Sequence, residues 1–220
     1  RDSLGTLLSQ LKARGVTDVC FCGAIERPAF DPGALDQATL PLVPVMMKAM
    51  GTGDDGALRA VMALFEDHGF AVQAAQALAP DLLAPEGVLS AAQPDAQMHS
   101  DVNHADAVLA ALSPLDVGQG CVVGGGLVWG VETIGGTDHM LSTLPDQAAS
   151  KRAVLVKHPK TGQDLRADLP TVGPATIERL VAAGLAGMVI EAGAVLLLDR
   201  DETIARADAA GLVLWSRRAG

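Results

Sequence analysis

The sequence predicts an α/β protein with a Rossmann-like N-terminal domain, whose first strand is expected to be missing, and a separate α/β C-terminal domain. Two observations predict this class. Helical segments with one apolar face alternate along the chain with short apolar runs of strand length. The composition is typical of packed domains with many turns, because 49 % of the 220 residues are hydrophobic and 24 are glycine.

The N-terminal domain is expected over residues 1–80. Its predicted elements are a helix over 3–14 that ends at Gly15, a buried strand over 16–23 containing Cys20 and Cys22, a short buried helix over 40–50, a helix after the turn at 51–55, and a strand over 71–78. Doubly wound domains usually open with a strand, whereas this chain opens with a helix. We therefore expect an N-terminal strand and its loop to be missing.

Residues 81–94 are rich in Pro, Ala and Gly and predict a linker, which leaves 95–220 as the C-terminal catalytic domain. Its predicted elements are a helix over 96–112, two strands around the glycine turn at 124–126, a helix over 138–149, a strand over 153–157, a helix over 174–183, strands over 187–190 and 194–198, a helix over 199–211 and a final strand over 212–216.

Charge and composition exclude some classes of partner. The formal charge is −10, and the chain has no Tyr, which argues against a nucleic-acid partner. The three cysteines lack CxxC spacing, which is typical of a reducing compartment without a metal–thiolate site. His99 and His104 are five residues apart, which does not fit a helical zinc pair. We expect a cytoplasmic protein without a membrane span.

One cationic segment interrupts this acidic chain. Five of the 16 Lys and Arg residues fall between positions 151 and 166, where Asp164 is the only acid: Lys151, Arg152, Lys157, Lys160 and Arg166. Asp168 follows, just before a new helical pattern. Lys and Arg neutralise phosphate oxygens, and a carboxylate at a helix entrance can hold Mg²⁺. The segment therefore favours a phosphorylated ligand, although a solvated β-hairpin is the alternative.

Other candidate residues lie in loops and turns, where sites assemble. Gly23 and Arg27 follow a predicted strand. Asp54 and Asp55 stand at a helix entrance, where they cap the helix or contact a ribose or a metal. A second group lies at strand ends and turns in the C-terminal half, with helix capping again as the alternative for the last two members: Gln119, Glu132, Thr137 and Asp138.

Six stretches together resemble one known family. They are VCFCGAIERPAF at 19–30, GDDGALRAVMALFEDHGF at 53–70, LDVGQGCVV at 115–123, VETIGGTD at 131–138, KHPKTGQDLRADLPTVG at 157–173 and AGLAGMVIEAGAVLLLDR at 183–200. The chain resembles the UDP-2,3-diacylglucosamine diphosphatases of lipid A biosynthesis, in the Mg²⁺-dependent form once known only as a domain of unknown function. Ala24 stands where members commonly have Asn, and Gly135 stands where an acid can appear.

The resemblance implies hydrolysis of UDP-2,3-diacylglucosamine to UMP and 2,3-diacylglucosamine 1-phosphate, with water attacking the phosphorus on the sugar side. It makes Asp168 the key acid. We expect Lys157 to share the catalytic role and Mg²⁺ to be the cofactor, held by Asp168 with Asp138 or Glu132. The expected substrate contacts are Gly23, Arg27, Asp54, Asp55, Gln119, Thr137, Lys160, Gln163, Arg166 and Thr171.

The amphiphilic substrate implies an apolar groove between the domains and a transient contact with the inner-membrane surface. Assembly of the chain into a homodimer is left open. Two rival functions also stay open at this point. One is a non-catalytic protein that binds a nucleotide sugar or a lipid phosphate. The other is an NAD(P)-dependent oxidoreductase, which requires a G-x-G-x-x-G turn after a strand, and no such turn is visible in this sequence.

Overall fold

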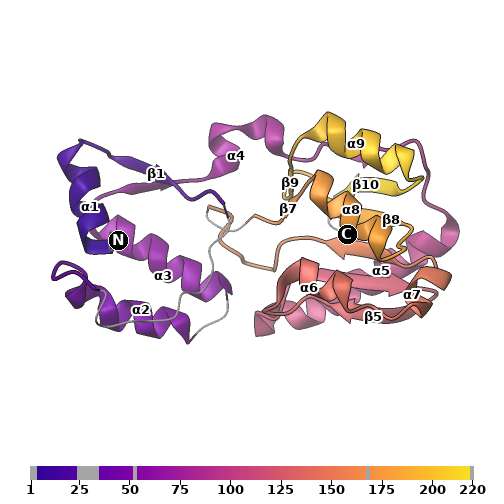
Figure 1. The fold of residues 1–220 in the computed structure, drawn as a ribbon, viewed down its shortest axis with the longest axis horizontal. Coiled ribbons are helices and arrows are strands. Elements are labelled where there is room, and N and C mark those ends of the chain that lie inside the picture. Colours follow the sequence, from indigo (N-terminus) through magenta and orange to yellow (C-terminus); the bar gives the residue numbers. More distant parts are fainter. Residues whose placement is uncertain (1–3, 24–34, 52–53, 167–168, 219–220) are drawn as a thin grey trace. The chain divides into compact units, whose positions relative to one another are not determined.

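The structure is a computed structural model and describes residues 4–23, 35–51, 54–166 and 169–218. The chain divides into two compact units (Figure 1). The first contains Arg1–Ala79 and Asp164–Asp168, and the second contains Pro80–Gln163 and Leu169–Gly220. No helix in the described ranges is both long enough and apolar enough to cross a lipid bilayer.

The first unit is built mainly from helices around a parallel pair of strands. Its elements are α1 (Leu4–Ala13), β1 (Asp18–Cys20), the 3₁₀ helix η2 (Leu40–Leu42), α2 (Val43–Met50), α3 (Asp54–Asp67), β2 (Ala71–Gln73) and α4 (Ala75–Leu78). Strand β1 pairs in parallel with β2, the pairing that a βαβ unit produces. The Rossmann-like class of this domain stays a prediction.

Aromatic side chains form much of the core of the first unit. Phe65 on α3 meets Phe21 edge-on, with ring centroids 5.1 Å apart, and lies 5.8 Å from Phe70. Helix α1 approaches the turn before η2 so closely that a Cβ on Gly5 would lie 2.3 Å from the Ala38 carbonyl carbon. The wholly buried Thr39 then accepts a 2.7 Å hydrogen bond from the Gly5 amide.

Three expectations for this unit were wrong. Strand β1 is short, with Cys20 half-buried and Cys22 exposed, and only Ala49 is buried among the α2 side chains that the structure describes. In the described part of the unit the sheet has two strands, which are too few to enclose an apolar run on both faces. Residues 71–78 likewise form a three-residue strand followed by α4 instead of one long strand.

The second unit is a mixed sheet with helices on both faces. Its elements are η3 (Pro80–Leu82), β3 (Gly87–Val88), α5 (Ala96–Leu112), η4 (Ser113–Leu115), β4 (Gly120–Gly124), β5 (Leu127–Val131), α6 (Gly136–Ser142), α7 (Gln147–Ser150), β6 (Val154–Lys157), β7 (Thr171–Val172), α8 (Pro174–Ala182), β8 (Gly187–Glu191), β9 (Leu196–Leu197), α9 (Arg200–Ala209) and β10 (Val213–Arg217). The main sheet has the order β3-β10-β8-β6-β4-β5, in which β6, β8 and β10 are parallel.

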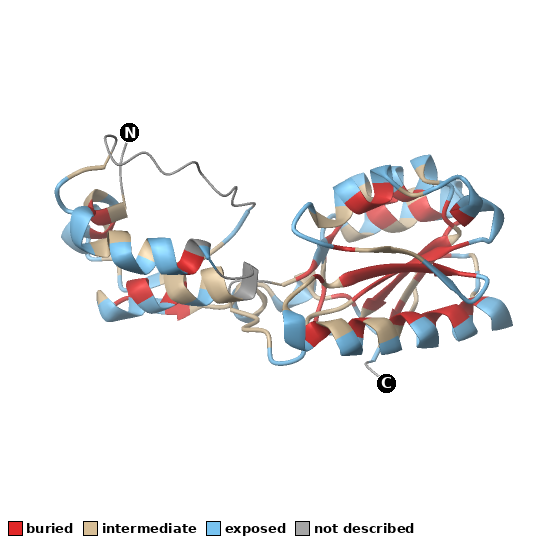
Figure 2. Cartoon of the chain, turned by 90° about the horizontal axis from the view of Figure 1, so that it is seen from below, coloured by how far each residue is buried: buried red, intermediate tan, exposed pale blue. Residues whose placement is uncertain are grey.

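Alternation along β6 determines which face each side chain joins. Val154 and Val156 pack in the core that α5 covers, whereas Leu155 packs in the core formed with α6, α8 and α9. The buried strands lie between these helical layers (Figure 2). Since successive side chains of a strand point to opposite faces, Lys157 at the end of β6 falls on the side of Leu155, toward α6 and α8.

Residues 81–94 do not form the expected linker, because main-chain hydrogen bonds attach them to the second unit. Strand β3 pairs antiparallel with β10, and the buried Ala84 donates its amide to the Val195 carbonyl at 3.0 Å. The guanidinium of Arg200 donates to the carbonyl oxygens of Asp81 and Leu83. Composition rich in Pro and Gly thus marks an irregular but packed segment.

A buried carboxylate fixes the turn between β4 and β5. Asp101 on α5 is 1 % exposed and accepts hydrogen bonds from the amides of Gly125 and Gly126 at 3.0 and 2.7 Å.

Asp101→Asn leaves one acceptor oxygen for the two amides, so we expect it to lower the free energy of unfolding by about 1–3 kcal/mol. Urea unfolding measures the loss, and Asp146→Asn on the exposed surface should stay within about 0.5 kcal/mol of wild type. Equal stabilities for the two variants would contradict this role.

Candidate active site in the second unit

A buried ammonium group lies at the carboxyl end of the parallel strands. Lys157 is 6 % exposed, and its Nζ lies 3.1 Å from Glu132 Oε2 and 2.6 Å from Thr137 Oγ1. The Thr137 hydroxyl in turn donates to Glu132 Oε2 at 3.0 Å. The three side chains come from β6, the segment after β5 and the first turn of α6. They form a closed triangle of hydrogen bonds.

This arrangement leaves one donor of Lys157 for a ligand. A buried charge is costly unless it is paired, and the buried Glu132 supplies the opposite charge here. A protonated lysine has three N–H donors. Within the described residues two of them are used, by Glu132 and Thr137.

Lys157 forms part of the wall of a cavity of about 220 Å³. A cavity of this size has room for several water molecules or for a group with several oxygens such as a phosphate. Thr137 and Thr171 add hydroxyl groups to the lysine. The lining consists of Gly135, Gly136, Thr137, Asp138, Lys157, Thr171, Val172 and Thr176.

Chain topology explains how distant residues reach this cavity. Ligands in open α/β sheets dock at the carboxyl ends of the strands, and Lys157 ends β6. Thr171 lies in β7, which pairs in parallel with β9, and α8 starts directly afterwards with a proline in its first turn. The cavity therefore opens between the starts of α6 and α8.

Asp138 joins this cavity to a larger one. Its Oδ1 lies 2.8 Å from Nε of Arg179 on α8, and 64 % of its side chain is exposed. Both residues also line a second cavity of about 630 Å³, whose walls include Leu141 and Leu144. The ion pair thus spans from α6 to α8 where the two cavities meet.

Three other expected site residues of the second unit lie elsewhere. Lys160 pairs with Asp116, and its amide donates to Gln163 Oε1 at 2.8 Å. Gln119 accepts a hydrogen bond from the His158 amide through its carbonyl oxygen, while its side-chain Oε1 is buried without a hydrogen-bond partner among the described residues. None of the three is among the residues that line the cavity of Lys157.

Arg166 belongs to the first unit and is fully engaged there. Its Nη1 lies 2.5 Å from Glu66 Oε1, and its Nη2 lies 2.7 Å from Asp164 Oδ2. Hydrogen bonds from Arg166 hold the pKa of Asp164 below its ordinary value. Gln76 also donates to the Leu165 carbonyl at 3.0 Å.

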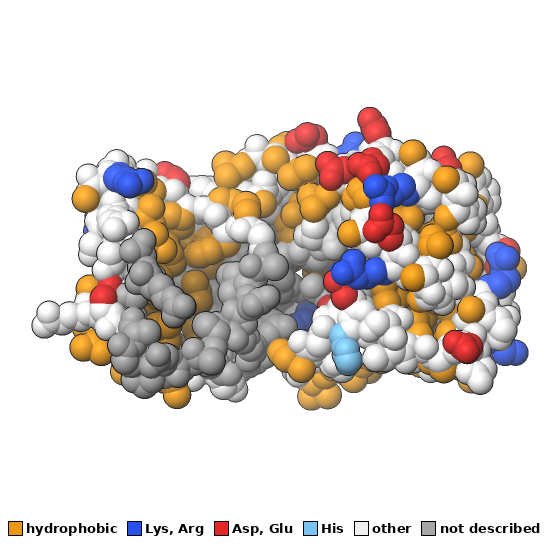
Figure 3. Space-filling model, viewed as in Figure 1, with side chains coloured by type: hydrophobic (Ala, Val, Ile, Leu, Met, Phe, Trp, Pro, Cys, Tyr) orange, Lys and Arg blue, Asp and Glu red, His pale blue; other side chains and the backbone are white. Residues whose placement is uncertain are grey.

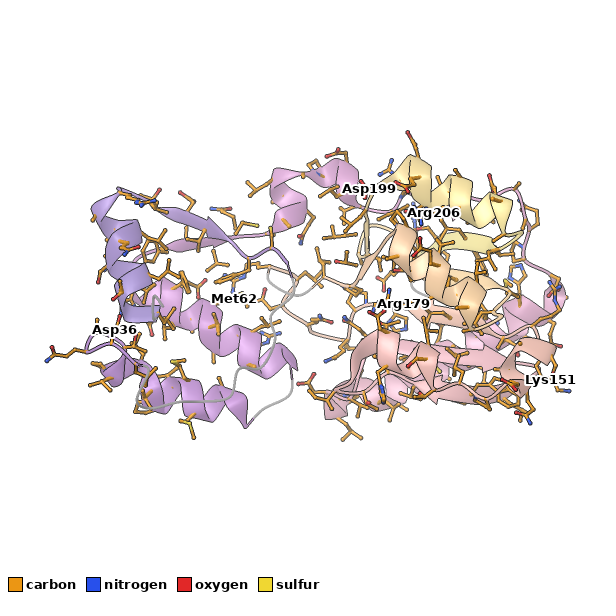
Figure 4. The ribbon with its side chains drawn as sticks, viewed as in Figure 1. Asp36, Met62, Lys151, Arg179, Asp199 and Arg206 are labelled. Carbon is orange, nitrogen blue, oxygen red and sulfur yellow. The ribbon has the colours of Figure 1, made fainter. Side chains whose placement is uncertain are left out.

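The four cations of the 151–166 segment that belong to the second unit therefore do not share one phosphate-binding patch. Lys151 lies beside α7 (Figure 4), and Arg152 is 3.5 Å from Asp95. Lys157 and Lys160 are buried against different carboxylates. On the face of the second unit drawn in Figure 3, basic side chains likewise lie beside acidic ones. Within the part of the chain that the structure describes, four of the five cations of the segment are each paired with a carboxylate instead.

Several expected site residues cannot be placed. Asp168 and Arg27 lie outside the described residues. Asp54 and Asp55 begin α3, but their side chains also lie outside the description. Gly23 has a φ of +98°, a left-handed conformation that favours glycine, and it ends the described segment after β1.

The described residues contain no group of three His, Cys, Asp or Glu side chains that could hold a metal ion. Glu132 fits a metal poorly, because its Oε2 already accepts hydrogen bonds from Lys157 and Thr137. Asp138 fits a metal better, since it is exposed and lines the cavity, although its carboxylate also forms an ion pair with Arg179.

Sequence reasoning missed Thr176, Gly136 and Arg179. Thr176 lies in the first turn of α8. Its position could have been predicted from the sequence, because it follows the expected substrate contact Thr171 by only five residues. The contact between Arg179 and Asp138 depends on how α6 and α8 pack, for which no local signal exists.

These features define a two-unit α/β protein with a buried, carboxylate-paired lysine and an anion-sized cavity at the carboxyl end of its sheet. The LpxI N-terminal domain family matches residues 2–82, and the LpxI C-terminal domain family matches residues 85–215. The chain belongs to the LpxI family. These matches confirm the predicted two-domain α/β organisation and the family resemblance.

A curated relative supports the same assignment. The UDP-2,3-diacylglucosamine pyrophosphatase LpxI of Caulobacter vibrioides is 40 % identical to the chain over 215 residues. The match covers 94 % of this chain and 77 % of the relative.

The pairing of Arg166 generates a prediction that depends on pH. Arg166→Leu should lower the free energy of unfolding at pH 7 by about 0.2–1 kcal/mol, because the guanidinium is 40 % exposed and solvent screens its ion pairs. The folded-state pKa of Asp164 is depressed, so its contribution exists above the unfolded pKa and disappears as the pH falls through the folded pKa. Urea unfolding at pH 7 and pH 3 should show the difference between variant and wild type shrinking. An equal difference at both values would contradict the pairing.

Proposed function

We propose that the chain hydrolyses the diphosphate bridge of UDP-2,3-diacylglucosamine, releasing UMP and 2,3-diacylglucosamine 1-phosphate. The name of the Caulobacter relative states a pyrophosphatase activity on UDP-2,3-diacylglucosamine. The family resemblance implies the two products and a place in lipid A synthesis. The observation that carries the proposal is the buried Lys157, which keeps one donor for a ligand on the wall of a phosphate-sized cavity.

Hydrolysis forms one bond and breaks one. A water oxygen bonds to the phosphorus on the sugar side, and the bond from that phosphorus to the bridging oxygen breaks. UMP leaves with the bridging oxygen, and the protons of the attacking water pass to the solvent. Negative charge grows on the phosphate oxygens and the leaving oxygen during this step, so fixed positive charge nearby lowers the barrier.

Lys157 supplies such a charge without rearrangement. Its ammonium is already held by Glu132 and Thr137, so its remaining donor binds a phosphate oxygen in the cavity. Thr137 holds the ammonium at this wall, because its hydroxyl accepts from Lys157 and donates to Glu132. Thr171 lines the same cavity, with its hydroxyl donating to the Leu169 carbonyl.

Asp168 completes the site in this proposal as the acid that the family resemblance implies. It precedes Thr171, a cavity residue, by three positions in the sequence. Asp138 and Asp168 would hold Mg²⁺, whose charge would offset that of the diphosphate when bound. The expected membrane-surface contact, the homodimer and the remaining substrate contacts belong to the proposal as well.

Lys157→Met keeps the length of the side chain and removes its charge. We expect kcat for UMP release to fall about 10²–10³-fold, as when one charge-stabilising donor is removed from an active site. Chromatographic detection of UMP measures the effect, and Lys151→Met on the exposed surface is the matched control. Turnover by Lys157→Met near the wild-type rate would exclude the lysine from the reaction.

Asp168→Ala should keep the fold and substrate binding while losing nearly all turnover. Circular dichroism and a binding measurement with the diacylated nucleotide sugar establish the first part, and UMP release establishes the second.

EDTA should abolish UMP release by wild type, and added Mg²⁺ should restore it. Binding without any turnover by the wild-type chain would instead favour a non-catalytic carrier of nucleotide sugars.

A further inference from the structure

Two glycines leave the space that Glu132 occupies. A Cβ at Gly120 would lie 2.5 Å from Glu132 Oε2, and one at Gly118 would lie 2.0 Å from the Glu132 carbonyl oxygen. Carbon atoms do not approach oxygen so closely, so a larger residue at either position would displace Glu132. The Glu132 amide also donates to the Gly120 carbonyl at 2.8 Å. The segment from Gly118 to Gly120 therefore fixes both the backbone and the carboxylate of Glu132.

The carboxylate is directed at the ammonium group of Lys157. Only 11 % of the Glu132 side chain and 7 % of the Lys157 side chain are exposed. Glu132 Oε2 accepts from both Lys157 and Thr137, and Thr137 also accepts from Lys157. Two hydrogen bonds of this triangle hold the lysine directly, and the third joins the two side chains that hold it. Glu132 is not among the residues that line the cavity.

We propose that Glu132 is a positioning residue, which holds the Lys157 ammonium at the cavity wall and neither ligates a metal nor touches the substrate. This inference rests on the proposed function, because it concerns the group that Lys157 offers to the diphosphate. The four-carbon stem of lysine is flexible, and each ammonium can rotate its donors. Without the buried carboxylate the ammonium has only Thr137 to fix it.

Glu132→Gln is the first test, because it keeps the volume of the side chain and removes the charge. We expect kcat to fall about 10²-fold, the typical cost of a misplacement of about 1 Å, with KM changed little. The Mg²⁺ concentration that gives half-maximal activity should stay at the wild-type value, since a positioning residue does not bind the metal. Gly120→Ala should lower kcat in the same direction, because its Cβ displaces the Glu132 carboxylate without changing the chemistry of that side chain.

Asp101→Asn is the matched control. Asp101 is also a buried carboxylate of the second unit, but its hydrogen bonds hold the turn at 125–126 and it is not a cavity residue. We expect this variant to lose stability while its kcat per folded molecule stays at the wild-type value. A purely structural role for Glu132 would give Glu132→Gln the same behaviour.

A stability cycle tests the pair independently of activity. Lys157→Met leaves a buried carboxylate without its counter-charge, whereas Lys157→Met combined with Glu132→Gln removes both charges. We therefore expect the double variant to have a higher Tm than Lys157→Met alone, a non-additive result that two contacting residues produce. Additive changes in Tm would overturn the pairing.

The outcomes separate this inference from the proposed function. Wild type that hydrolyses the substrate together with a fully active Glu132→Gln variant overturns the positioning role alone. An increased Mg²⁺ requirement in that variant also overturns it, by making Glu132 a metal ligand. Absence of hydrolysis by wild type, with Mg²⁺ present, overturns the proposed function, and the Tm cycle then still decides whether Glu132 and Lys157 act as a pair.

Discussion

The contact between Lys157 and Glu132 is the interaction on which the candidate site depends. Charged groups this deeply buried are unfavourable when alone, so each residue requires the other. The pair converts a flexible lysine into a fixed positive group, and it also neutralises the site before a ligand arrives. A diphosphate then meets a donor whose position was set during folding, which is the condition for efficient electrostatic stabilisation.

Ordinary strand geometry in the sheet brings Lys157 and Glu132 together. Alternation along β6 directs Lys157 away from α5, and the antiparallel pairing of β4 with β5 and β6 brings the residue after β5 alongside the end of β6. Glu132 reaches the lysine only because Gly118 and Gly120 carry no side chains. Topology, residue alternation and two glycines are thus all required for one ion pair.

Much of the second unit followed from its sequence, since long periodic segments predict elements well. The helix over 96–112 agrees with α5, and the strand expected over 153–157 agrees with β6. Packing between distant elements had no such signal. The basic segment predicted one patch, but burial of Lys160 against Asp116 and of Lys157 against Glu132 divides it. The linker was also misjudged, because composition does not reveal that β3 completes a sheet edge.

The path of the chain between the units has a consequence for how the protein can be divided. The backbone passes between them three times, at residues 79–80, 163–164 and 168–169. After a single proteolytic cut near residue 80, the C-terminal fragment would still carry Asp164 to Arg166, which belong to the first unit and include the partner of Glu66. A C-terminal fragment expressed alone would carry Arg166 without Glu66, so domain-wise dissection of this protein requires redesign of that excursion.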